Sequence, residues 1–77
     1  MKVKFRIKSW SDTHFGKETK LASFKETAEV FYKLLNEYEV KEISVQRVKI
    51  EGKTYELPGF TSANNTHFYI QAISTED

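Results

Sequence analysis

The sequence predicts an α+β fold, a two-layer sandwich in which one amphipathic helix packs on a mainly antiparallel 4–5-stranded sheet. Apolar residues recur at helical spacing only between Phe24 and Tyr38, while flanking segments alternate or have strand composition. A single helix cannot bury its own apolar stripe, so a sheet has to supply the second layer. The expected order is strand, strand, helix, strand, strand, strand.

Composition limits the chain to a single domain over residues 1–77 with a small core. Hydrophobic residues make up 39% of the chain, which argues against disorder, and the absence of cysteine excludes a disulfide framework. No apolar run reaches the length of a signal peptide core or a membrane span. A cytoplasmic protein without membrane association is therefore expected.

The first strand is predicted by Val3, Phe5 and Ile7, which alternate with basic residues. Residues 11–16 have turn composition and predict a loop. Residues 17–22 alternate more weakly and predict a second strand, antiparallel to the first.

The helix is predicted over Phe24–Tyr38, preceded by a capping box. In that motif the Ser23 hydroxyl accepts from the Glu26 amide, and the Glu26 carboxylate returns to the Ser23 amide. The apolar stripe expected to face the sheet contains Phe24, Ala28, Phe31, Leu34, Leu35 and Tyr38.

A hairpin is predicted around Glu51-Gly52, with the third strand over residues 40–50. The apolar residues of this strand change phase between Val45 and Val48, which predicts a bulge near Gln46 and Arg47. The turn predicts that Ile50 pairs with Lys53, Val48 with Tyr55 and Gln46 with Leu57, with Tyr55 and Leu57 on the core side.

Pro58-Gly59 predicts the end of the fourth strand, and residues 58–66 then have loop composition. Within this loop an exposed Phe60, together with Asn64 and Asn65, is one candidate site for contacting a protein. The alternative is that Phe60 folds back onto the core. The last strand is predicted over residues 67–74.

The face of the sheet opposite the helix is the second candidate site. Basic side chains that track phosphates and aromatic rings that stack on bases would make it a nucleic-acid surface. A merely solvated outer face is the competing and commoner arrangement. The residues predicted to form the site are Lys4, Arg6, Lys8, Trp10 and Tyr69.

Catalytic and metal chemistry find little support in the sequence. Asp12, His14 and His67 could approach one another, but a metal site needs more ligands than their spacing secures. No paired carboxylates, activated nucleophile or glycine-rich phosphate loop stands out. We therefore expect a non-enzyme without cofactor or metal.

Two functions remain. The first is a small protein-binding module, an adaptor or an inhibitor such as a phage or mobile-element inhibitor of a host nuclease or defence complex, which is an analogy from size. The second is a nucleic-acid-binding protein that uses the outer face. Net charge of +1, from twelve basic and eleven acidic residues, favours the first. Homodimerisation through the open sheet face or an edge strand is a further possibility.

Overall fold

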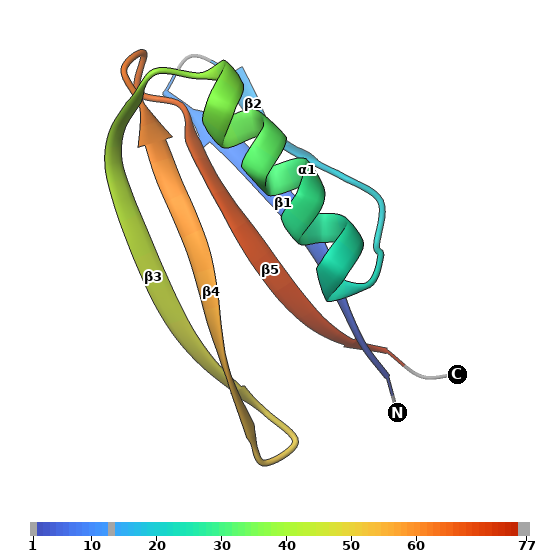
Figure 1. Cartoon of the computed structure of the whole chain (residues 1–77). Helices are drawn as coiled ribbons and strands as arrows, with labels where there is room; N and C mark the ends of the chain where they lie inside the picture. Colours follow the sequence, from blue (N-terminus) through green and yellow to red (C-terminus); the bar gives the residue numbers. More distant parts are fainter. Residues whose placement is uncertain (1, 13, 76–77) are drawn as a thin grey trace.

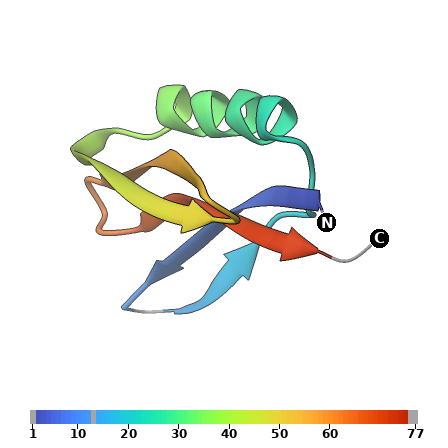
Figure 2. The same cartoon turned by 90° about the horizontal axis from the view of Figure 1, so that it is seen from below.

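The computed structural model describes residues 2–12 and 14–75. One helix packs on an antiparallel sheet with the strand order β2-β1-β5-β4-β3, which confirms the predicted α+β class and element order. The helix covers one side of the sheet, and no helix of the described chain covers the other (Figures 1 and 2). The elements are β1 (Lys2–Ser11), β2 (His14–Glu18), α1 (Phe24–Glu37), β3 (Val40–Ile50), β4 (Lys53–Ser62) and β5 (His67–Thr75).

The helix begins as its cap predicts. The Glu26 amide donates to the Ser23 hydroxyl at 3.2 Å, and the Ser23 hydroxyl donates to the Glu26 carboxylate at 3.2 Å. The Glu26 carboxylate thus contacts the Ser23 hydroxyl, whereas the capping box predicted a contact with the Ser23 backbone amide. Tyr38 ends the helix as its C-cap. Thr27 does not belong to the predicted apolar stripe, yet it is buried. A polar side chain is tolerated there because its hydroxyl donates to the Phe5 carbonyl at 3.3 Å.

The second strand lies earlier than predicted. β2 is His14–Glu18 instead of residues 17–22, and after it the chain stays beside β1 without forming a regular ladder. Thr19 donates its amide to the Ile7 carbonyl, and Ala22 forms an isolated bridge with Phe5. The predicted loop over residues 11–16 is therefore wrong at both of its described ends, which belong to β1 and β2.

The β3–β4 hairpin has the predicted register, with Ile50 opposite Lys53 and Gln46 opposite Leu57. Glu51 and Gly52 both have positive φ, 52° and 80°, as the tight turn of a twisted hairpin requires. The bulge expected near Gln46 is absent, since pairing is regular from Glu42 to Ile50; the register shifts instead between Val40 and Glu42.

The fourth strand does not end at Pro58-Gly59 but continues to Ser62. In an antiparallel ladder, residues alternately direct their N–H and C=O groups toward one neighbour and then the other. The Ile50–Lys53 pair that flanks the turn is hydrogen-bonded, so alternation directs the nitrogen of Pro58 toward β5. The ladder with β3 therefore loses no hydrogen bond at this proline. Pairing of β4 with β5 covers only Gly59–Thr61, so it stops at the first position where proline cannot donate.

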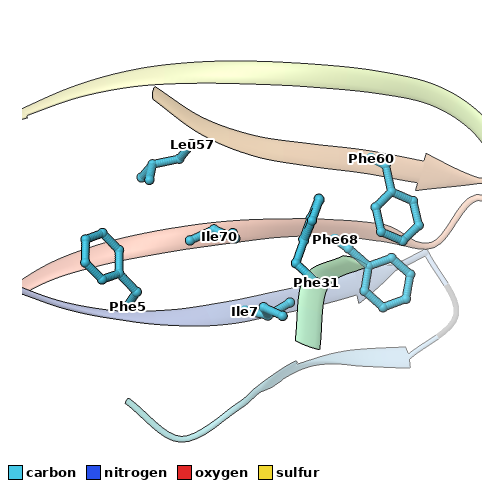
Figure 3. Close-up of a cluster of buried hydrophobic side chains, with 7 residues drawn as sticks. All are labelled: Phe5, Ile7, Phe31, Leu57, Phe60, Phe68 and Ile70. Carbon is cyan, nitrogen blue, oxygen red and sulfur yellow. The ribbon is translucent and has the colours of Figure 1, made fainter. Parts of the chain in front are cut away.

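Toward its turn the β3–β4 hairpin separates from β5 (Figure 1), and the β4–β5 ladder covers only Gly59–Thr61. Because the hairpin turns away from β5, side chains on the two opposite faces of β4 both contact the same hydrophobic core. Phe60 packs on α1 through Phe31, with ring centroids 5.5 Å apart, while Tyr55 contacts Phe5 at 5.7 Å. The buried cluster in Figure 3 consists of Phe5, Ile7, Phe31, Leu57, Phe60, Phe68 and Ile70.

Candidate functional sites

The outer face of the sheet brings together the five residues predicted there. Alternation places the even-numbered residues of β1 opposite the helix, and the β1–β5 register sets Lys8 beside Tyr69 and Trp10 beside His67. The site is therefore a row along β1, Lys4, Arg6, Lys8 and Trp10, with Tyr69 on the neighbouring strand. Because β1 lies between β2 and β5, this basic strand is not an edge of the sheet.

Part of the positive charge in this row is neutralised within the molecule. Glu18 of β2 accepts from Arg6 at 2.8 Å and from Lys8 at 3.4 Å. Arg6 also donates from Nε to the Gln71 side chain at 2.9 Å. A phosphate would have to compete with Glu18 for two of the cations, which leaves Lys4 as the lysine of the row best placed for an external anion.

An open groove of about 450 Å³ lies at the Trp10 end of this face. Trp10 stacks on His67 with ring centroids 4.2 Å apart, and His67 Nδ1 shares a hydrogen bond with Thr61 Oγ1 at 3.0 Å. Gly59 pairs with Tyr69 beside the groove, and a Cβ there would come to about 3.0 Å from the Phe68 carbonyl oxygen. The groove can hold a flat or extended group against the Trp10 ring.

The loop site predicted around Phe60 does not form. Phe60 lies inside β4, is 2% exposed and stacks on Phe68 at 4.8 Å, so the alternative that it belongs to the core is correct. Asn64 accepts hydrogen bonds from the Ser62 hydroxyl and the Thr66 amide, and it thereby shapes the β4–β5 turn. Asn65 has a positive φ of 64° and accepts from Lys41 at 3.1 Å. Of the three residues predicted to form this site, Asn64 and Asn65 are exposed and Phe60 is buried.

The structure gives no support to a metal site at Asp12, His14 and His67. Among the residues that the structure describes, no group of three or more histidine, cysteine, aspartate or glutamate side chains could hold a metal ion. The His14 side chain lies outside the described part, and His67 is engaged with Trp10 and Thr61. In the same described range, no helix is long and apolar enough to cross a membrane.

A third candidate surface is the open edge of β3. The sequence predicts pairing through an edge strand but does not identify that strand, and the strand order shows that β3 is an edge. Within residues 2–12 and 14–75, no strand pairs with β3 on the side away from β4. Ile43 and Val45 are 66% and 63% exposed there, the highest values among the large hydrophobic residues of the described chain. We call this surface the β3 edge, defined by Ile43, Val45, Arg47 and Lys49.

The backbone of the β3 edge is open to a partner strand. Since Ile50, Val48, Gln46 and Ser44 direct their N–H and C=O groups to β4, the four residues of the β3 edge direct theirs outward. Their side chains lie on the face of the sheet that carries Phe60 and the helix, because Ile43 is directly opposite Phe60. An extended segment could therefore add to the sheet and cover Ile43 and Val45 at once.

Comparison of the chain with protein families, with curated proteins and with solved structures gives no match.

Proposed function

We propose that the chain is a protein-binding module, an adaptor or inhibitor, which holds an extended segment of a partner protein against the β3 edge. The observation that carries this proposal is an edge strand of 11 residues whose two central apolar side chains are more than 60% exposed. Long edges with exposed apolar residues favour association with another strand unless they are protected. Strand addition supplies main-chain hydrogen bonds and pockets for alternate side chains.

Site-specific photo-crosslinking tests this function. A benzoylphenylalanine at Val45, in cells that produce the protein, is expected to yield crosslinked protein, whereas the same group at Glu29, exposed on α1, is not. Adding Ile43→Pro removes an outward N–H of the β3 edge and should abolish the product at Val45. Equal crosslinking at both positions, or none at Val45, would contradict the proposal.

Nucleic-acid binding is the second candidate, favoured by the alignment of Lys4, Arg6, Lys8 and Trp10 on one face. Lys4→Glu with Arg6→Glu is expected to abolish binding of a mixed-sequence single-stranded oligonucleotide, measured by fluorescence anisotropy. The matched control is Lys20→Glu with Lys25→Glu, which changes net charge equally at exposed positions elsewhere. Unchanged binding in the first variant, or affinity insensitive to salt, would rule this candidate out.

A further inference from the structure

The β3 edge has a definite order of side-chain chemistry. Ile43 and Val45 are apolar, Arg47 and Lys49 are cationic, and no acidic residue belongs to this row. Arg47 forms an ion pair with Glu56 of β4 at 3.2 Å, and both side chains are mostly exposed. Lys49 lies opposite Thr54. One half of the β3 edge is therefore apolar and the other half carries excess positive charge.

A second copy of the chain fits this edge poorly. In an antiparallel pair related by a two-fold axis at Ser44, Ile43 meets Val45, but regular pairing then covers only residues 42–46, because the register shifts between Val40 and Glu42, and Arg47 and Lys49 lie outside it. An axis at Val45 sets Arg47 opposite Ile43, and an axis at Gln46 sets both cations opposite the apolar residues. None of these registers gives Arg47 or Lys49 an acidic partner, and an axis at Arg47 or Val48 sets cation opposite cation, which destabilises a sheet.

We infer that the occupant of the β3 edge is an extended segment of another protein with the pattern acidic-x-acidic-x-apolar-x-apolar, from N- to C-terminus. This inference rests on the proposed function and names the chemistry of its partner. In an antiparallel arrangement the two acidic residues lie opposite Lys49 and Arg47, and the two apolar residues lie opposite Val45 and Ile43. Every side chain on the edge then has a complementary neighbour.

Titration of isotope-labelled protein with synthetic peptides, followed by NMR, tests the pattern. The probe is a capped peptide Thr-Glu-Thr-Glu-Thr-Val-Thr-Val-Thr, which is expected to shift the backbone amides of Ile43, Val45, Arg47 and Lys49. One control peptide carries lysine in place of both glutamates, and the other has the reversed sequence. The lysine peptide is expected to bind about tenfold more weakly, because it replaces two attractive charge pairs by like-charge pairs. The reversed peptide is also expected to bind more weakly, because it can restore the charge pairs only as a parallel strand, which pairs less stably.

A charge reversal on the protein provides the reciprocal test. Lys49→Glu should weaken the acidic peptide about fivefold and bring the lysine peptide closer to it in affinity. Lys53→Glu is the matched control, since it makes the same charge change at an exposed position of β4 and should leave both affinities unchanged.

The outcomes separate this inference from the proposed function. Equal binding of either control peptide at the β3 edge would overturn the pattern and leave strand addition intact. Binding of no peptide would overturn the pattern, and the crosslink at Val45 would then decide the proposed function independently. Concentration-dependent shifts of the same amides in the protein alone would identify a second copy as the occupant and overturn the inference.

Discussion

Phe60 links the three parts of the core at the scale of a single residue. Its ring lies 5.5 Å from Phe31 of α1 and 4.8 Å from Phe68 of β5, while its backbone belongs to β4. The helix, the central strands and the hairpin therefore meet at one buried side chain.

Phe60→Leu is expected to lower the free energy of unfolding by about 1–3 kcal/mol, because it removes two aromatic contacts and leaves a small cavity. Phe24→Leu is the matched control, since Phe24 is 44% exposed and contacts only Phe5 among the described aromatic rings. It should cost less than about 1 kcal/mol. Urea unfolding measures both values, and equal losses would contradict this account of Phe60.

The misassignment of Phe60 has a local cause. Pro-Gly is a strong turn signal, and it predicts a loop for the residues that follow. The strand survives because Pro58 directs its nitrogen away from β3 and because Gly59 is needed where Ser44, Phe68 and Tyr69 approach. Both conditions depend on neighbours that are distant in sequence, so residue types alone could not show them.

At the scale of elements, the parts fixed by local geometry were predicted well. The two-residue turn determines the register of the β3–β4 hairpin from Ile50 back to Glu42, and the capping residue determines the start of α1. The bulge near Gln46 was wrong because the apolar phase change has another origin: Ile43 and Val45 lie on the free edge, and Val48 packs against the core. β2 was misplaced because its position depends on pairing with β1.

The direction of the backbone groups in β3 gives a prediction for neighbouring prolines. Val45→Pro removes an N–H that faces outward, so it should destabilise the protein only modestly. Gln46→Pro removes an N–H that faces β4 and should cost at least about 2 kcal/mol more, since a ladder hydrogen bond is lost and its acceptor left unpaired. Comparison of urea midpoints checks the order, and a more damaging Val45→Pro would contradict the derived orientation of the edge.

At the scale of the whole molecule, the sheet has two unequal parts. β1 and β5 pair continuously from Lys2 to Trp10, whereas β4 and β5 pair only over Gly59–Thr61. The turn end of the β3–β4 hairpin, from Gln46 to Leu57, is therefore expected to open more readily than the central ladder.

Amide hydrogen exchange measures this difference. The amides of Val48 and Tyr55 in the hairpin should exchange at least about tenfold faster than those of Arg6 and Gln71 in the β1–β5 ladder. Identical protection in the two regions would show instead that the hairpin and the central strands open as one cooperative unit.

The candidate surfaces also differ in how far the sequence could predict them. Alternation along β1 is a local property, so the row from Lys4 to Trp10 was correctly placed on one face. Whether a strand lies at an edge is a property of the complete sheet. The exposure of Ile43 and Val45 followed only from the strand order, in which β3 comes last.

Pro58 connects this edge to the rest of the molecule. Pro58→Ala would supply a backbone N–H at this position, which could donate to the Ile70 carbonyl. The β4–β5 ladder would then extend by another pair. The hairpin would then lie closer to β5, and the angle between β3 and α1 would change. If the proposed function holds, substitution at position 58 would therefore change the affinity for a partner strand through the orientation of β3, without altering any residue of the β3 edge.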